Sequence, residues 1–91
     1  MTAERKKELK EISKEIDALK MHLEDIKGRL TSIYEDEDDA FRARTDRYCD
    51  SIEYKVAEET CTNLYQAEYY IGTSIGDMGT ALDYIESALD Y

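Results

Sequence analysis

The stretch LKEISKEIDALKMHLEDIKGRLTSI, residues 9–33, places an apolar side chain at every third or fourth position. These positions are Leu9, Ile12, Ile16, Leu19, Leu23, Ile26, Leu30 and Ile33. Alternating steps of three and four are the seven-residue repeat of helices that pack at a shallow angle. We therefore predict a first helix over about residues 3–34, with Thr2 as its N-cap and a second helix along its apolar side.

Five consecutive acids follow at residues 35–39. We expect them to end the first helix in a solvated turn over residues 35–38, with Asp38 or Asp39 capping the next helix, because carboxylates accept the free N–H groups there. The alternative is a calcium loop. It lacks support because the run contains no glycine and no EF-hand spacing, so we predict no metal site.

A second helix is predicted over about residues 38–71. Its apolar stripe comprises Phe41, Thr45, Tyr48, Ile52 and Val56, then Leu64, Ala67 and Ile71. The polar stretch 58–63 between these groups is either a buried polar site or an exposed part of the seam. Two helices of similar length with a short turn predict an antiparallel hairpin. The hairpin would set Arg5, Lys6, Lys7 and Lys10 beside the far end of the second helix, whose dipole is negative there.

Three glycines, Gly72, Gly76 and Gly79, predict a hinge over residues 72–79. A shorter third helix is expected over about residues 77–90, with Ile75, Met78, Leu82, Ile85 and Leu89 on its apolar side. Alternatively, the second helix continues past a kink and overhangs the first, which would demand a partner such as a second copy. The predicted fold class is all-α: one domain over residues 1–91, a long coiled-coil-like hairpin with a third C-terminal helix.

Charge is distributed unevenly along the 91 residues, whose net charge is −10. Residues 1–34 hold eight Lys/Arg and seven Asp/Glu, and residues 35–91 hold four and fifteen, which gives +1 and −11. A field of this sign attracts basic surfaces and repels nucleic acid and anionic membranes. We expect no direct binding to nucleic acid or membrane. With no signal peptide in view and Cys49 and Cys61 too far apart on one helix to pair, we expect a cytoplasmic location.

Catalytic motifs are missing from the sequence. His22 is the single histidine, the cysteines are not at C-x-x-C spacing, and the glycines form no phosphate-binding loop. We therefore predict that the protein is not an enzyme and holds no cofactor.

Tyrosine and acid are concentrated together in the second half of the chain. Tyrosine is favoured at interfaces because it brings a large area and a hydroxyl with few torsions to freeze. The candidate partner-binding residues are Asp50, Glu53, Tyr54, Glu58, Glu59, Tyr65, Glu68 and Tyr69. For Tyr65 and Tyr69, interface and core are equally weighted. For Tyr48, Tyr70 and Tyr84 we expect core positions.

Two classes of function fit these features. The first is a small acidic inhibitor or adaptor that occupies a basic surface of a larger protein, and mimicry of nucleic acid is one way to do so. In size and acidity the chain resembles phage-encoded inhibitors of host defence, including anti-CRISPR proteins. The second is an assembly hairpin that homodimerises or pairs with another helical chain. Small helical partners in type VII secretion are similar in outline, although the W-x-G turn is missing because the chain has no Trp.

Overall fold

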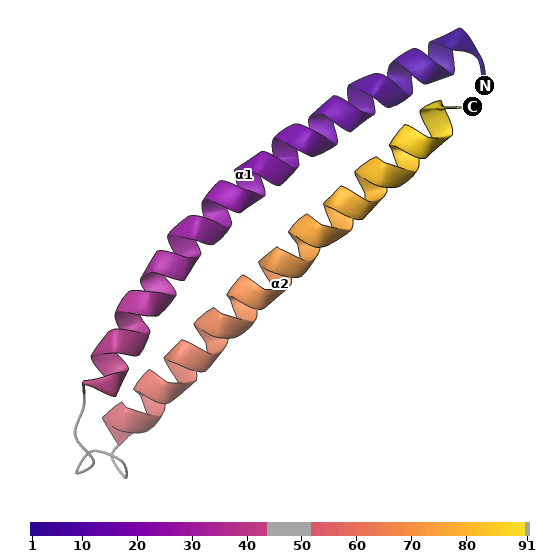
Figure 1. The fold of residues 1–91 in the computed structure, drawn as a ribbon. Helices are drawn as coiled ribbons and strands as arrows, with labels where there is room; N and C mark the ends of the chain where they lie inside the picture. The colour runs from indigo at the N-terminus through magenta and orange to yellow at the C-terminus, as the bar shows by residue number, and fades with distance from the viewer. Residues whose placement is uncertain (44–51, 91) are drawn as a thin grey trace.

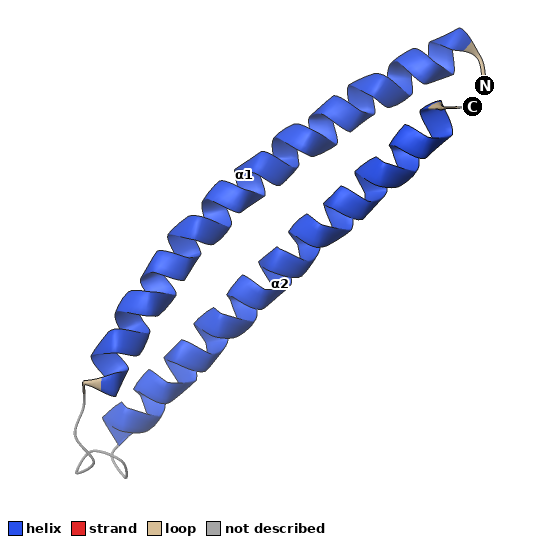
Figure 2. Cartoon of the chain, viewed as in Figure 1, coloured by secondary structure: helices blue, strands red, loops and turns tan. Residues whose placement is uncertain are grey.

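The computed structural model describes residues 1–43 and 52–90, and it shows two long helices lying side by side (Figure 1). Helix α1 spans Ala3–Arg42 and helix α2 spans Ile52–Leu89. Both chain ends lie at the same end of a rod that measures 68 × 16 × 15 Å. All regular structure in the described residues is helical (Figure 2). The predicted all-α antiparallel hairpin is therefore confirmed.

The N-terminal cap of α1 is formed as predicted. Thr2 has an extended backbone, and its hydroxyl oxygen accepts a hydrogen bond from the backbone N–H of Arg5 at 3.2 Å. This bond satisfies one of the N–H groups that a helix start leaves without a partner.

The predicted end of α1 is wrong, because the helix continues through the acidic run to Arg42. Phe41 lies seven residues beyond Tyr34 and extends the seam by one repeat, and its ring centroid is 4.9 Å from that of Tyr54. Arg42 Nε also lies 2.8 Å from Asp38 Oδ2 one turn earlier. Successive carboxylates point about 100° apart on a helix, so most of the run stays in water. The turn expected over 35–38 and the second-helix start near 38 are therefore incorrect.

The predicted hinge over residues 72–79 and the third helix are also wrong. Helix α2 passes through all three glycines without interruption and reaches Leu89. The apolar spacing on either side of the glycines stays in one seven-residue phase, so a single straight helix keeps every seam residue against α1. Helix α1 has 40 residues and α2 has 38, so the two are nearly equal in length and α2 does not overhang α1 (Figure 1).

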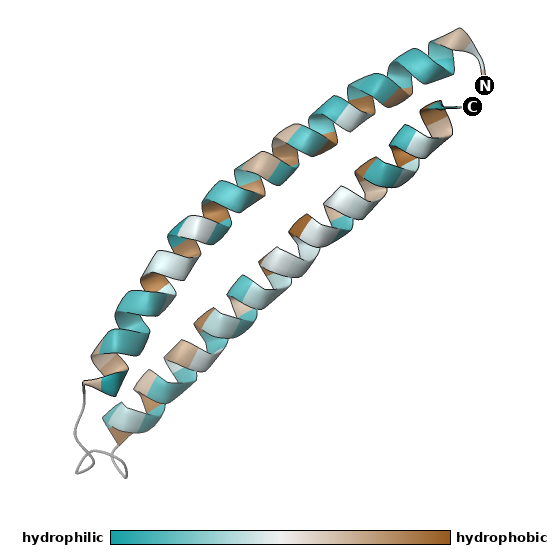
Figure 3. Cartoon of the chain, viewed as in Figure 1, coloured by the Kyte–Doolittle hydropathy of each residue, from teal (hydrophilic) through white to brown (hydrophobic). Residues whose placement is uncertain are grey.

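Apolar side chains meet along the line between the helices, where Figure 3 shows brown on the facing sides. The α1 positions on this seam are Lys6, Leu9, Ser13, Ile16, Lys20, Leu23, Lys27, Leu30, Tyr34 and Phe41. The α2 positions are Tyr54, Ala57, Cys61, Leu64, Glu68, Ile71, Ile75, Met78, Leu82, Ile85 and Leu89. Among the described residues only Cys61 is buried, and the rest of the seam is half-buried.

The seam differs from the predicted one by a rotation of each helix. On α1, Ile12, Leu19 and Ile33 were expected on the seam but are exposed. Lys20 and Lys27 lie on the seam in their place and are half-buried. On α2, Ile52, Val56 and Ala67 are exposed, so the predicted stripe is wrong at these positions, and its members Thr45 and Tyr48 lie outside the described residues. The polar stretch 58–63 is exposed except for Cys61, so it is not a buried polar site.

Candidate protein-binding surfaces

The predicted partner-binding residues divide between the seam and the outer surface of α2. Tyr54 and Glu68 are half-buried on the seam. The exposed members are Glu53, Glu58, Glu59, Tyr65 and Tyr69. Asp50 lies outside the described residues. The set therefore does not form one continuous face, because two of its members point towards α1.

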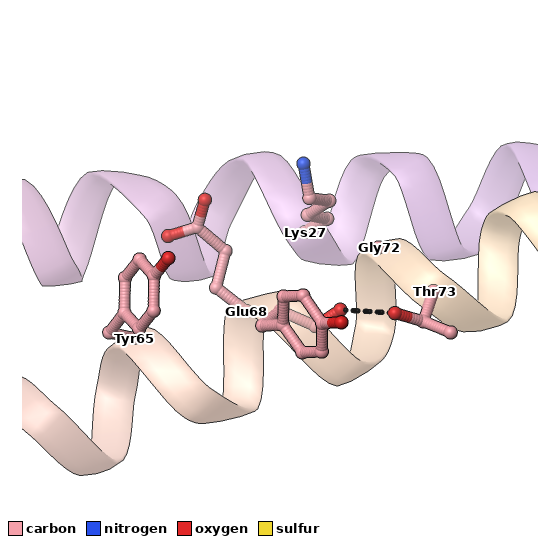
Figure 4. Close-up of a pocket in the computed structure, with 6 residues that line it drawn as sticks. Lys27, Tyr65, Glu68, Gly72 and Thr73 are labelled. Atoms are coloured by element: carbon pink, nitrogen blue, oxygen red, sulfur yellow. Dashed lines mark hydrogen bonds between the residues drawn. The ribbon is translucent and has the colours of Figure 1, made fainter.

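A shallow groove runs beside α2 where Lys27 of α1 crosses Gly72 (Figure 4). A Cβ on Gly72 would lie 3.2 Å from Lys27 Cε, so glycine is what allows the lysine stem to lie against α2. Tyr65, Glu68, Tyr69 and Thr73 complete the lining, and the Thr73 hydroxyl donates to the Tyr69 carbonyl at 3.1 Å. The groove offers aromatic faces, one carboxylate and one ammonium group. Such a surface can bind a side chain of another protein.

Tyr34 packs on the α1 side of this region, with its ring centroid 6.0 Å from that of Tyr65. Partial burial raises the pKa of the Tyr34 phenol above its usual 10.0, and the nearby carboxylate of Asp38 raises it further. The guanidinium of Arg42 partly offsets these effects. The Tyr34 phenol therefore keeps its proton to a higher pH than an isolated tyrosine does.

Tyr70 and Tyr84 are not core residues, contrary to the prediction. Their side chains are 64% and 75% exposed, and Tyr70 makes an edge-on ring contact with Tyr69 at 5.5 Å. Tyr48, the third tyrosine expected in the core, lies outside the described residues. Two aromatic side chains that were expected in the core therefore lie on the surface of α2, where a partner can contact them.

A second surface was not predicted as a binding site. The aliphatic side chains of Ile12, Leu19 and Ile33 lie on α1 seven and fourteen residues apart and flank the seam, and Leu19 and Ile33 are 55% and 53% exposed. We call these three residues the aliphatic ladder. The signal was present in the sequence, since residues 9–33 carry more apolar positions than one partner helix can cover. The spacing alone predicts a single seam that contains all of these positions.

Within the described residues, no three His, Cys, Asp or Glu side chains gather in a way that could hold a metal ion. His22 is exposed on α1. Neither helix has a stretch that is long and apolar enough to cross a membrane. The ion pairs found in the part of the chain that the structure describes, Arg29–Asp25 and Arg42–Asp38, each join residues on one turn of α1.

The fold and its surfaces define a helical hairpin without close relatives among the proteins compared: no family model, curated protein or solved structure matches the chain.

Proposed function

We propose that this protein is a non-enzymatic assembly module, which works by packing its hairpin against helices of another polypeptide chain. The uncovered aliphatic ladder of α1 carries the proposal. Large aliphatic side chains at seven-residue spacing are what a helix presents to a neighbouring helix. Two helices with one buried residue between them also lack the burial that stabilises a domain of this size. Association supplies the missing burial.

The test is the mass of the assembly, compared between the wild type and the variant Leu19→Gln/Ile33→Gln. We expect wild-type protein, alone or in the complex it forms in its native cells, to exceed the monomer mass of 10.6 kDa in light scattering. The double variant should return to the monomer mass. Met21→Gln is the matched control, because Met21 is an exposed apolar residue of α1 outside the ladder. Equal masses for wild type and double variant would contradict the proposal.

A second candidate function, capture of a basic protein surface, is favoured by the outer side of α2. Exposed Tyr69, Tyr70 and Tyr84 lie there among acids, and Ile52–Leu89 contains seven Asp/Glu and one Lys. This is the chemistry of an acidic inhibitor or adaptor, including one that mimics nucleic acid as anti-CRISPR-like phage proteins do. Steering by such a field speeds association and weakens with salt.

The second candidate has its own test. Reversing Glu58, Glu59 and Glu68 to Lys should weaken binding to a basic partner by roughly tenfold or more, while helicity measured by circular dichroism is kept. Retention of the same partner at 1 M salt, or by the reversed variant, would argue against charge-led capture.

A further inference from the structure

The apolar side chains of α1 form two neighbouring columns, and α2 covers only one of them. The covered column contains Leu9, Ile16, Leu23 and Leu30, which are half-buried. The second, which we call the outer column, lies three residues further along: Ile12, Leu19 and Ile33 are exposed, and Ile26 between them is half-buried. Burying the exposed apolar surface of this column would stabilise the protein by about 25 cal/mol per Å².

Helix α2 carries a column of small residues at the same seven-residue spacing. This small column contains Thr60, Ala67, Ser74, Ala81 and Ala88, all exposed. Its hydroxyls are already satisfied within the helix: Thr60 Oγ1 donates to the Val56 carbonyl at 2.8 Å, and Ser74 Oγ donates to the Tyr70 carbonyl at 3.0 Å. Covering this column would therefore leave no hydroxyl without a hydrogen bond.

Both columns lie on the same broad face of the hairpin. The opposite face is marked by a groove that Glu24, Thr31 and Gly72 line together. Glu24 and Thr31 flank the α1 seam on that side, so the outer column, which flanks the seam on the other side, faces away from the groove. The same reasoning on α2 sets the small column opposite Gly72. One face is thus built from large side chains of α1 and small side chains of α2.

The register of the hairpin places the two columns level with each other. Lys27 lies against Gly72, Lys20 lies against Gly79 seven residues on, and the ring of Tyr34 is beside that of Tyr65. Each step of seven along α1 therefore matches a step of seven back along α2. The level pairs are Ile12 with Ala88, Leu19 with Ala81, Ile26 with Ser74 and Ile33 with Ala67.

We propose that a second copy of the chain covers this face, related to the first by a two-fold axis parallel to the helices. This proposal rests on the proposed function and names the partner. Such an axis keeps every residue at its height and sets α1 of each copy against α2 of the other. The outer column of one copy then packs on the small column of the other, so that each large side chain meets a small one. The product is a four-helix bundle in which all neighbouring helices are antiparallel.

Size excludes the other two-fold arrangement. An axis perpendicular to the helices would set α1 against α1 and α2 against α2, so that Leu19 and Ile33 would meet large side chains while Ala67 and Ala81 met small ones. The first contact is overpacked and the second leaves voids, and both destabilise a helix interface.

Charge selects the same arrangement. Helix α2 carries seven acids and one base, a net charge of −6, whereas α1 carries twelve acids and nine bases, a net charge of −3. Contact between α1 of one copy and α2 of the other avoids placing two copies of the more acidic helix side by side. The area suffices as well, because a face 68 Å long and 16 Å wide offers roughly 1,000 Å² per copy, and a stable interface needs about 800 Å² per partner.

Disulfide cross-linking between two single-cysteine variants tests the arrangement. In a background that carries Cys49→Ser and Cys61→Ala, chains with Leu19→Cys are mixed with chains with Ala81→Cys and oxidised, so that only intermolecular disulfides can form. We expect the mixed disulfide to predominate, and light scattering of the background protein to give about twice the monomer mass. Predominance of disulfides between two Leu19→Cys chains or two Ala81→Cys chains, or no cross-link at all, would overturn the proposal.

A size swap tests the packing independently of oxidation. Leu19→Ala and Ala81→Leu should each weaken the dimer by about tenfold or more, while the two changes in one chain should recover most of the affinity because volume is conserved. Met21→Gln should have no effect. Double-variant loss equal to the product of the single losses would contradict contact between the two columns.

The outcomes separate this proposal from the proposed function. A wild-type protein that is monomeric at tens of micromolar overturns the second copy as partner. If Leu19→Gln/Ile33→Gln then still removes the protein from a larger complex in its native cells, the assembly function stands with a different helical partner. If the same variant changes neither mass, both proposals fail.

Discussion

Individual glycines report how closely the two helices approach each other. A Cβ on Gly28 or Gly76 would meet no other atom within 4 Å, whereas one on Gly72 would lie 3.2 Å from the end of the Lys27 side chain. Side chains of α1 therefore come close to α2 at Gly72 and Gly79. An added methyl group therefore has free space at Gly76 and is crowded at Gly72, although both glycines lie in α2.

Substitution by alanine should resolve this difference. Gly28→Ala and Gly76→Ala should each raise the free energy of unfolding by about 0.5–1 kcal/mol, because alanine loses less backbone entropy in a helix and meets no neighbour. Gly72→Ala should gain less, since the lysine stem must shift. Urea denaturation at one fixed chain concentration measures all three. Destabilisation by Gly28→Ala would show that another chain occupies the space beside it.

Tyr34 should titrate above the ordinary tyrosine pKa of 10.0. Its pKa is raised in the folded protein by partial burial and the Asp38 carboxylate, so the folded state holds the phenolic proton more tightly than the unfolded state. The resulting stabilisation is fully present below pH 10 and is lost as pH rises through the folded pKa. Absorbance titration at alkaline pH should show a phenol ionisation above pH 10.0 that is lost in Tyr34→Phe. A profile unchanged by this substitution would assign the late phenol elsewhere.

At the scale of the helix, the sequence was sufficient for element type and insufficient for element ends. The repeat at residues 9–33 specifies a helix that packs along one side, and the structure contains it. The end of α1 was missed because the acidic run 35–39 was weighed as a local signal, while Tyr34 and Phe41 continue the repeat on either side of it. Packing of two aromatic side chains outweighs repulsion among carboxylates that all reach water.

Phe41 should therefore hold the last turns of α1 in place. Phe41→Ala removes its ring contact with Tyr54 and should cost about 0.5–1.5 kcal/mol for the aromatic pair, plus the lost burial. Amide hydrogen exchange should speed up over residues 35–42 and stay unchanged over residues 9–30. Uniform acceleration along α1 would show that the helix opens as one unit.

The candidate site illustrates what one sequence cannot specify. An apolar stripe wider than one contact can be centred on either of its columns, and the choice depends on how the partner helix is rotated. Lys27 lies on the seam beside Gly72 and Lys20 beside Gly79, and this pairing depends on the register of residues far apart in sequence. The sequence therefore predicted which residues are apolar and acidic, but not which of them the hairpin leaves uncovered.

For the whole molecule, folding and association should be coupled. Because only one residue in the described part of the hairpin is buried, the chain should gain most of its apolar burial in the dimer, so its melting temperature should rise with chain concentration. Circular dichroism melts over a hundredfold range of concentration measure this effect. A melting temperature independent of concentration would show that the hairpin is stable as a monomer.

Salt distinguishes the two ways in which this acidic rod can bind. Each chain carries a net charge of −10, so salt screens repulsion between copies while leaving apolar contacts intact. The dimer dissociation constant should thus stay constant or fall between about 0.05 and 0.5 M salt, since the Debye length shrinks over that range. Capture of a basic surface by α2 should weaken over the same range, because attraction is what is screened. Sedimentation equilibrium measures the first, and titration with a basic partner measures the second. A dimer that dissociates as salt rises would mean that ion pairs between α1 and α2 of different copies, rather than the aliphatic ladder, hold it together.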